Sequence, residues 1–339
     1  MPGTIISSDD AFSTRELSVR ASDTARFPAV RTPLSEVFTD VEYLTDRTAV
    51  IDVEAAALPA LSDGTWGTVI PVTEVNRDRK SFALVPPKVG KTFDIKPGEI
   101  QSVRMTGEID RESLMSVQDR KTGQVFLAVE DYHERARLAA LQGNVINNAG
   151  TVLADLRSSA YFDVEANAVV GLELDATSPA PGALRQKFAS LIRAVEDRLQ
   201  IGQGVMSGLD VQANSDLFDL LRWHPETQEA FKRWEDLARP EGSPILPFRF
   251  AGVNFYDYRR AGLASGRGIA IPRGVPGMFK TIFTPGDFMK ELNGPALPRY
   301  LSVRELDHDK GFEYEASTNA IHICNRLEAV FEIDAGDGL

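Results

Sequence analysis

The strongest hydrophobic pattern in the chain lies in residues 124–142. Apolar and aromatic side chains recur there at helical spacing, while most of the charged residues fall outside that stripe. The stripe consists of Val125, Val129, Tyr132, Ala136 and Ala140. The spacing predicts an amphipathic helix roughly 28 Å long, and Gly143 is a typical residue with which to end it. Because only one face is apolar, we expect strands to pack against this helix.

The remaining pattern predicts two α+β units. A second apolar stripe predicts another amphipathic helix at about 184–199, in the same unit as the first helix. From about residue 205 onward, short strands and helices alternate, so we place a second unit at 205–298. Three further strands follow, and we expect them to return to the first unit. They lie at 312–315, 321–324 and 329–333.

Several shorter elements follow from local signals. We predict a strand at 160–164, and an aromatic-rich run predicts a single strand at 248–258. Pro225 is expected to open a helix, because proline suits the first helical position. Thr284-Pro285 predicts the start of another helix that ends at Gly294.

Two segments have little core of their own. Residues 1–32 are polar and lack apolar periodicity, which predicts an extended arm that is ordered only by contact with another molecule. Residues 50–95 combine alternating strands with a charged tip, which predicts an extended hairpin. An isolated two-stranded ribbon is marginally stable in water, so we expect this hairpin to lie on a neighbouring molecule. Its Arg77, Arg79 and Lys80 form the one tight basic cluster of the sequence.

Composition and charge narrow the class of protein. The chain has 339 residues, 43% of them hydrophobic and 25% charged, which is typical of a soluble globular protein with two or three packed units. Its net charge of −12 disfavours a surface that wraps nucleic acid, because phosphate contacts need clustered Lys and Arg. Cys324 is the single cysteine, so no internal disulfide forms. We find no secretory signal and no membrane-spanning run, and we expect a soluble protein made inside the cell.

The candidate phosphate and dinucleotide motifs are both defective. Val89-Gly90-Lys91-Thr92 resembles the end of a phosphate loop, but Val85 stands where the loop needs glycine, and Pro86-Pro87 lack N–H donors. Residues 202–207 lack the last glycine of the dinucleotide fingerprint and precede a predicted strand where a helix should begin. A hinge or linker explains residues 202–207 better.

No other residues form a catalytic or metal-binding pattern. Asp307-His308-Asp309 could ligate a metal, but without further ligands a solvated turn is the better interpretation. His133, His224 and His322 have no partner at a catalytic spacing. No pair of carboxylates stands in an apolar setting that would raise a pKa. The residues therefore predict no enzyme activity, no cofactor and no metal.

Several segments with a specific sequence follow one another along the chain. The most specific are FAGVNFYDY at 250–258, IPRGVPGMF at 271–279 and TPGDF at 284–288. Others occur in the arm, in the hairpin, before the long helix and near the end of the chain, at 34–38, 48–54, 77–82, 95–104 and 312–320. In their order and spacing, over nearly the whole chain, these segments resemble the lambda-type (E protein) family of tailed-phage major capsid proteins.

The resemblance implies an α+β fold of the tailed-phage and herpesvirus major capsid type. Such a fold has an N-terminal arm, an extended loop, a peripheral domain built on a long spine helix, and an axial domain. The expected ranges, with a final segment returning to the peripheral domain, are 1–48, 49–98, 99–204 with the spine helix at 124–142, 205–298, and 299–339. The expected subunit-interface residues are Arg77, Arg79, Lys80 and Phe82.

The resemblance also implies a function in the virion capsid. Such a protein self-assembles into pentamers and hexamers that form an icosahedral shell around packaged double-stranded DNA, without sequence-specific binding of that DNA. A separate scaffolding protein and a portal are the expected partners, a decoration protein is compatible, and assembly is expected in the host bacterial cytoplasm. Two alternatives remain: an encapsulin-like nanocompartment shell around an enzyme cargo, and a phosphate-binding enzyme that uses Lys91.

Overall fold

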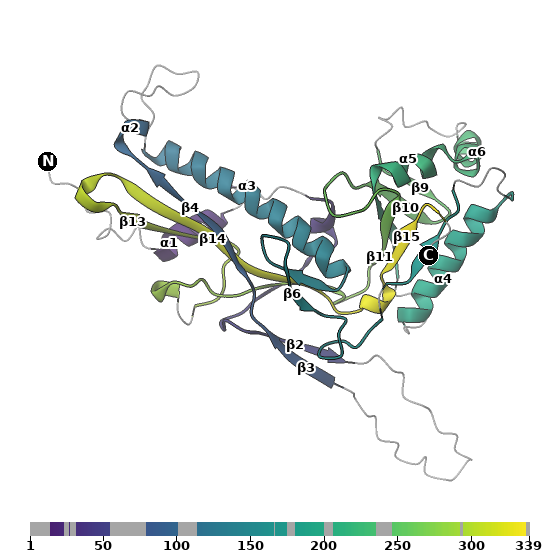
Figure 1. Cartoon of the computed structure of the whole chain (residues 1–339), viewed down its shortest axis with the longest axis horizontal. Coiled ribbons are helices and arrows are strands. Elements are labelled where there is room, and N and C mark those ends of the chain that lie inside the picture. The colour runs from purple at the N-terminus through teal and green to yellow at the C-terminus, as the bar shows by residue number, and fades with distance from the viewer. Residues whose placement is uncertain are drawn as a thin grey trace, which may run out of the picture.

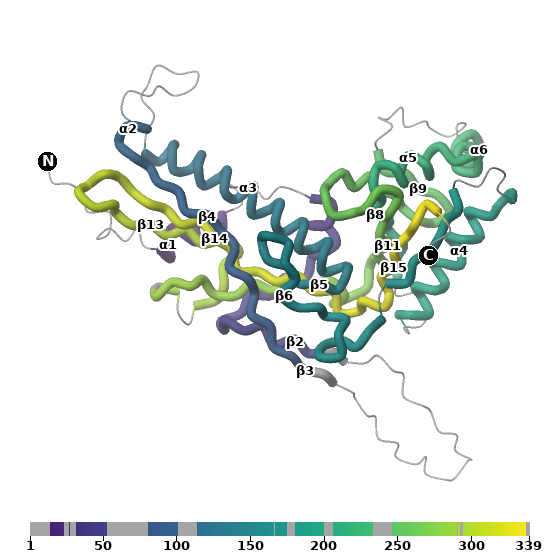
Figure 2. The backbone as a smooth tube through the Cα atoms, viewed as in Figure 1, coloured from purple at the N-terminus to yellow at the C-terminus, as the bar shows by residue number. Residues whose placement is uncertain are grey.

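Two β-sheets lie toward opposite ends of an elongated molecule (Figure 1). One is a five-stranded sheet crossed by the long helix α3, and the other is a six-stranded sheet beside the helices α4, α5 and α6 (Figure 2). The structure is a computed structural model. It describes residues 14–23, 27, 32–54, 79–100, 114–165, 167–174, 180–199, 206–234, 246–291 and 294–336.

Helix α3 spans Leu114–Leu141. It confirms the predicted helix at 124–142 but begins earlier, so the predicted start is wrong. The first turns bury the polar side chains of Gln118 and Thr122. Because these buried positions are polar, the apolar periodicity does not extend to the start of the helix. At the other end Gly143 has a φ of 80°, the left-handed conformation in which glycine commonly ends a helix.

The five-stranded sheet packs against α3 through its long central strand β14. The strand order is β1-β12-β14-β13, and β4 also pairs with β14. The strands are β1 (Asp40–Tyr43), β4 (Lys88–Ile95), β12 (Phe279–Phe283), β13 (Tyr300–Glu305) and β14 (Phe312–Cys324). The core between this sheet and α3 includes Phe126, Val129 and Tyr314, all of them buried. The expected packing of strands on the long helix is therefore confirmed.

The six-stranded sheet draws its strands from distant parts of the chain. Its order is β7-β15-β11-β8-β10-β9. The strands are β7 (Val169–Gly171), β8 (Gly208–Ala213), β9 (Phe248–Phe250), β10 (Val253–Asp257), β11 (Arg267–Arg273) and β15 (Phe331–Asp334). The helices beside it are α4 (Ala183–Leu199), α5 (Ser215–Trp223) and α6 (Pro225–Trp234). The start of α6 at Pro225 confirms the helix predicted there.

Sheet membership differs from the two units predicted from the sequence. Helix α4 was expected beside α3, but its Phe188 ring lies edge-on to Phe250 and Phe255 of the six-stranded sheet. Strand β15, expected to return to the first unit, joins that sheet as well. Strand β12, placed in the second unit, pairs instead with β1 and β14. An amphipathic stripe shows that a face is buried, but it does not show which sheet buries it.

Part of the predicted arm packs on its own chain. Helix α1 (Thr14–Ser22) buries Leu17 and Ala21, and the Ser18 hydroxyl accepts the N–H of Leu301 in β13 at 3.2 Å. The prediction that residues 1–32 are ordered only by another molecule is therefore wrong for α1. A stripe of two apolar residues in so short a helix is too weak a signal to predict its burial.

The predicted hairpin is a two-stranded antiparallel ribbon. Strand β2 (Ala49–Glu54) pairs with β3 (Arg79–Leu84), and residues 55–78 lie outside the described part. The hairpin was expected to continue to about residue 95, but β4 leaves it and joins the five-stranded sheet. The ribbon is therefore shorter than predicted, and it projects from the body of the molecule (Figure 1).

The structure differs from three local predictions. Residues 160–164 form a turn with Asp163 at a φ of 58°, and not a strand. The single strand at 248–258 is divided into β9 and β10, because Ala251 and Gly252 adopt φ of 51° and 87°. The helix expected from Thr284-Pro285 is reduced to one 3-10 turn, η4 (Met289–Glu291). Positive φ angles interrupt regular structure without changing the apolar pattern that predicts it.

The remaining elements are short connections. They are η3 (Pro33–Glu36), α2 (Pro97–Ile100), β5 (Asn144–Ile146), β6 (Val152–Asp155), η5 (Asp307–Asp309) and η6 (Leu327–Ala329). The Asp307–Asp309 turn is exposed to solvent, as predicted. Among the described helices, none combines the length and the hydropathy that crossing a membrane requires.

Candidate assembly surfaces

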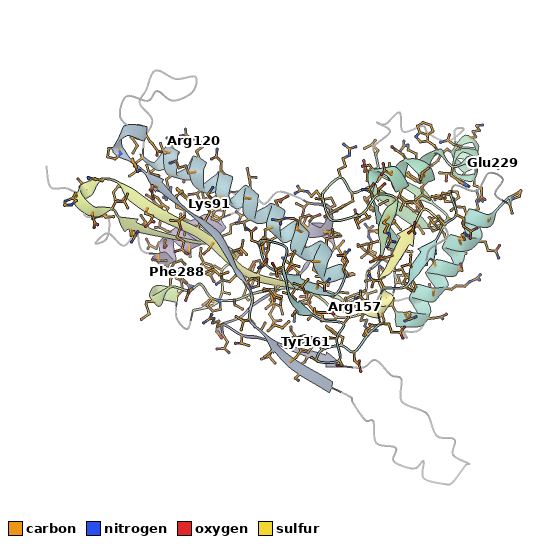
Figure 3. All side chains as sticks on the ribbon, in the orientation of Figure 1. Lys91, Arg120, Arg157, Tyr161, Glu229 and Phe288 are labelled. Carbon is orange, nitrogen blue, oxygen red and sulfur yellow. The ribbon has the colours of Figure 1, made fainter. Side chains whose placement is uncertain are left out.

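The root of the β2–β3 ribbon is fixed to the body of the same chain. Ile51 of β2 and Leu84 of β3 are buried. The ring of Phe82 lies edge-on to those of Tyr161 and Phe162, with ring centroids 5.1 and 5.4 Å apart. Figure 3 shows Tyr161 beside the ribbon, on the turn that follows β6. These aromatic contacts set the direction in which the ribbon leaves the body.

The structure describes three of the four predicted interface residues, and all three belong to β3. Phe82 is half-buried against its own chain. Arg79 and Lys80 belong to β3, and their backbones pair with β2. Arg77 lies outside the described residues. The interface role of these four residues stays a prediction, with Phe82 placed where it would orient the ribbon.

The other face of the ribbon is open and carries apolar side chains at its base. Val50, in β2, is 63% exposed, and Val85, directly after β3, is 53% exposed. The smaller Ala83, which pairs with Val50 in the ladder, is exposed as well. Apolar side chains grouped on a projecting ribbon are typical of a surface that another protein covers.

We expect Phe82→Ala to loosen the ribbon without unfolding the chain. The variant loses two edge-to-face ring contacts, a cost of about 1–2 kcal/mol. Hydrogen exchange of the β2 and β3 amides should become faster, while exchange in β14 should stay unchanged. Val50→Ala is the matched control, because that side chain is exposed. Equal exchange rates in the two variants would contradict the anchoring role of Phe82.

Arg157 holds the turn that carries Tyr161 and Phe162. Its Nε donates to the Gln142 carbonyl at 2.8 Å, and its Nη1 donates to the Glu165 carbonyl at 2.7 Å. These bonds connect the turn to the end of α3. No local pattern predicts this contact, because a single arginine reaches backbone groups from two segments.

A buried histidine pair joins α3 to the five-stranded sheet. His133 Nδ1 lies 3.0 Å from His322 Nε2, and both side chains are almost fully buried. His322 Nδ1 lies 3.0 Å from the Thr281 hydroxyl, and His133 Nε2 lies 3.5 Å from the Thr318 hydroxyl. These histidines have no partner at a catalytic spacing in the sequence, but the fold pairs them with each other from distant segments of the chain.

The hydrogen bonds around this pair fit two neutral rings. The Thr318 hydroxyl donates to the Pro298 carbonyl at 2.9 Å, so it accepts from His133 Nε2. His133 Nδ1 then accepts from His322 Nε2, and His322 Nδ1 accepts from Thr281. Burial lowers the pKa of His133 to about 3 and lowers that of His322 well below 6.5, and the positive charge of Arg137 adds to both shifts. The pair is a structural connection and has no access to a substrate.

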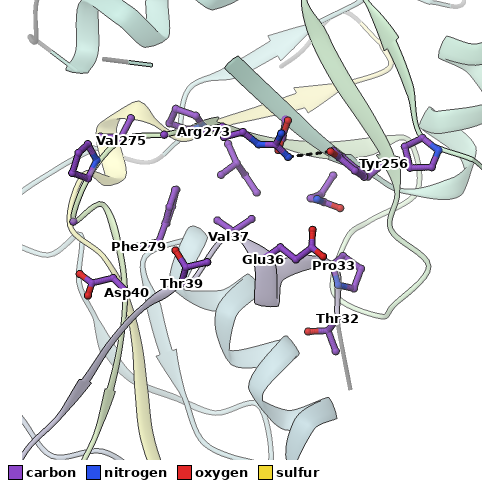
Figure 4. A pocket seen from close by; sticks show the side chains of 18 of the residues that line it. Thr32, Pro33, Glu36, Val37, Thr39, Asp40, Tyr256, Arg273, Val275 and Phe279 are labelled. Atoms are coloured by element: carbon purple, nitrogen blue, oxygen red, sulfur yellow. Dashed lines mark hydrogen bonds and ion pairs between the residues drawn. The ribbon is translucent and has the colours of Figure 1, made fainter. Parts of the chain in front are cut away.

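A groove of about 810 Å³ separates the η3 turn from the six-stranded sheet (Figure 4). Glu36 and Val37 lie on one wall, and Tyr256 and Arg273 lie on the other. Arg273 Nη2 is 2.8 Å from Asp210 Oδ2 and donates to the Tyr256 hydroxyl at 3.2 Å. The lining therefore combines apolar, aromatic and acidic side chains.

A second open apolar surface lies at the end of the six-stranded sheet. Trp223, the last residue of α5, is 63% exposed, and Leu220 one turn earlier is also exposed. Leu246 lies close by, because its carbonyl accepts from Arg222 Nη1 at 3.0 Å. Exposed tryptophan is typical of the centre of a protein interface.

The candidate phosphate loop is a strand. Gly90 and Lys91 belong to β4 and pair with Ser317 and Ala316 of β14. A Cβ built on Gly90 would lie 2.3 Å from the Ala316 carbonyl oxygen, so glycine permits the close approach of the two backbones. A ladder strand cannot wrap its amides around a phosphate, and the phosphate-loop interpretation at Lys91 is wrong. Within the described ranges, no group of three or more acidic, His or Cys side chains could hold a metal ion.

We expect Gly90→Ala to destabilise the chain by about 1–3 kcal/mol, because the methyl group overlaps the β14 backbone. Thermal unfolding measures the loss. Gly98→Ala in α2 is the control, since nothing lies within 4 Å of the Cβ position there. Equal unfolding temperatures for the two variants would show that β4 moves freely against β14.

The fold and these open surfaces define a subunit built to contact other molecules. Residues 24–335 match the sequence model of a protein family described as phage major capsid protein E. The chain belongs to this family. It is 24% identical over 283 residues to the major capsid protein of Salmonella phage Felix O1, covering 71% of this chain and 74% of that protein. Its role is that of a structural subunit of the virion shell.

Solved structures confirm the fold class. The putative capsid protein of a prophage of E. coli CFT073 aligns with a TM-score of 0.54 at 10% identity, over 95% of this chain and 99% of that one. A phage-related protein from Bordetella bronchiseptica RB50 aligns with a TM-score of 0.50 at 11% identity, over 94% of this chain and 97% of that one. The predicted capsid-type α+β fold is therefore confirmed.

Proposed function

We propose that this chain assembles into pentamers and hexamers that form an icosahedral head shell around packaged double-stranded DNA. The observation that carries the proposal is the β2–β3 ribbon, which projects from the body and exposes Val50 and Val85. A neighbouring subunit would cover these apolar side chains. Many repeated contacts of this kind stabilise a closed shell through multivalency, even where each contact is weak.

The two sheets support an assignment to two different domains of a capsid subunit. We assign the five-stranded sheet and α3 to the peripheral domain, and the six-stranded sheet to the axial domain that meets its copies at the centre of each capsomer. Sheet membership supports adding β7, α4 and β15 to the axial domain. The exposed Trp223 and Leu220 on α5 support a contact between copies at this end of the molecule.

The net charge of the chain supports its role in a shell that encloses DNA. A net charge of −12 favours a surface that surrounds DNA without binding its phosphates tightly. In this proposal a separate scaffolding protein and a portal take part in assembly in the host cytoplasm, and a decoration protein is compatible with the finished shell.

Electron microscopy and light scattering of the expressed chain test the proposal. The full chain, alone or with its scaffolding partner, should form closed particles or rings of five and six. Deleting residues 62–78 should leave a folded, soluble monomer or capsomer, as checked by circular dichroism. The ultraviolet absorbance spectrum of purified particles separates a DNA container from a nanocompartment with protein cargo. Absence of shells under every condition would overturn the proposal, whereas normal shells from the deletion would contradict only the role of the hairpin.

A further inference from the structure

The groove between η3 and the six-stranded sheet has an excess of negative charge. Its lining includes four carboxylates and one guanidinium, those of Glu36, Asp40, Asp210, Asp257 and Arg273. Asp210 pairs with Arg273, and Asp257 pairs with Arg259 outside the lining, at 2.7 Å. Glu36 and Asp40 are exposed, and in the described part of the chain neither carboxylate has an ion-pair or hydrogen-bond partner. The free charge therefore lies on the wall formed by η3 and the start of β1.

A buried amide in the same lining also lacks a partner. Gln212 of β8 is 3% exposed, and no group among the described residues donates a hydrogen bond to its Oε1. A buried carbonyl oxygen without a donor costs about 1–3 kcal/mol. The free carboxylates, rather than this enclosed oxygen, therefore favour an occupant that carries positive charge.

Apolar side chains complete the lining. Val37, Val275 and Phe279 line the groove together with Pro33 and Pro272. Figure 4 shows Val37 and Phe279 facing the same space as Arg273. Lys and Arg bury their aliphatic stems on apolar surface while their charged ends reach a carboxylate. A short basic segment fits this combination better than an apolar helix or a small anion.

We propose that this groove receives the basic segment 77–80 of a second copy of the chain. Arg77, Arg79 and Lys80 form the tight basic cluster of an otherwise acidic sequence, and their charge is opposite to that of the free carboxylates of Glu36 and Asp40. The chain's own ribbon leaves the body along the lower edge of Figure 1, whereas the six-stranded sheet lies at the upper right. The contact is therefore made between copies. This inference rests on the proposed shell and names one acceptor site for its hairpin.

A peptide-binding experiment tests the site without requiring a shell. A fluorescent peptide with the sequence of residues 74–83 is titrated against the full, unassembled chain, and its anisotropy is recorded. We expect saturable binding that weakens at least tenfold in Glu36→Lys/Asp40→Lys and falls steeply with salt. The matched control is Glu305→Lys/Asp307→Lys, at the exposed end of β13 and in the turn that follows it, which should bind like the wild type. Absence of binding, or equal binding by both double variants, would overturn the inference.

Charge reversal in the assembling protein provides the second test. Glu36→Lys/Asp40→Lys and Arg77→Glu/Arg79→Glu should each lower the yield of shells several-fold, while circular dichroism shows both chains folded. Combining the four substitutions should restore at least half of the wild-type yield, because opposite charges meet again. A combined variant no better than the weaker parent would contradict the pairing and point to a basic segment of another protein. If the wild type forms no shells, the proposed function fails, and the peptide result still decides the groove.

Discussion

Arg299→Ala should lower the free energy of unfolding of the unassembled chain by about 3–5 kcal/mol, because it leaves a buried charge without its partner. Arg299 is 5% exposed. Its Nη2 donates to Glu130 Oε1 at 2.9 Å, and its Nη1 donates to the Phe27 carbonyl at 2.8 Å. The guanidinium also lies 4.9 Å from the centre of the Phe126 ring. Chemical denaturation followed by circular dichroism measures the loss.

Arg304→Ala is the matched control for this prediction. Arg304 pairs with Glu313 between neighbouring strands, but its side chain is 72% exposed. Exposed ion pairs contribute little to stability, because water already solvates both charges. Similar losses in the two variants would mean that burial does not decide the strength of the Arg299 contact.

Acidification should destabilise the chain below about pH 6.5, because of the buried histidine pair. In the unfolded chain a histidine binds a proton near its ordinary pKa of 6.5, whereas burial lowers the pKa of His133 to about 3 and lowers that of His322 as well. Between these values the unfolded state holds more protons, so stability falls as the pH falls. Well below pH 6.5 each ring contributes about 1.4 kcal/mol per pH unit, and the two together lose about 3 kcal/mol of stability between pH 6.5 and 5. Burial also lowers the pKa of His224, which acts in the same direction.

The window between pH 6.5 and 5 separates this effect from that of carboxylates, whose ordinary pKa is about 4. Urea denaturation at several pH values across the window measures the slope. His308→Asn is the control, because His308 lies in an exposed turn at a φ of 62° that asparagine tolerates. The control should keep the full slope. A wild-type stability that does not change across the window would contradict the buried neutral pair.

Buried polar contacts on α3 connect parts of the chain that are distant in sequence. Glu134 accepts the N–H of Leu34 at 3.2 Å, and Glu130 accepts from Arg299. Hydrogen bonds are directional, so they fix the position of the N-terminal segment and of the tail on α3 where apolar packing alone would tolerate displacement. The body from which the ribbon projects is thereby held as one unit, which a shell with repeated contacts requires.

The elements that a local sequence pattern indicates are predicted correctly. The apolar stripe and Gly143 predicted the end of α3, Pro225 predicted the start of α6, and alternation predicted the ribbon strands. The ordered segments at 250–258 and 271–279 predicted the family, which the comparisons confirm. The start of α3 was missed, because Gln118 and Thr122 are buried in spite of their polarity.

The sequence alone is enough to predict the strong local elements, the defect in the candidate phosphate loop, and the family. The tertiary structure alone decided that α4 packs with the six-stranded sheet, that α1 is covered by its own chain, and that His133 meets His322 across 189 positions of sequence. It also decided that Glu36 faces Arg273 across one groove. The reason is physical: periodicity records that a face is buried, whereas its partner is chosen by strand pairing between segments that share no local signal.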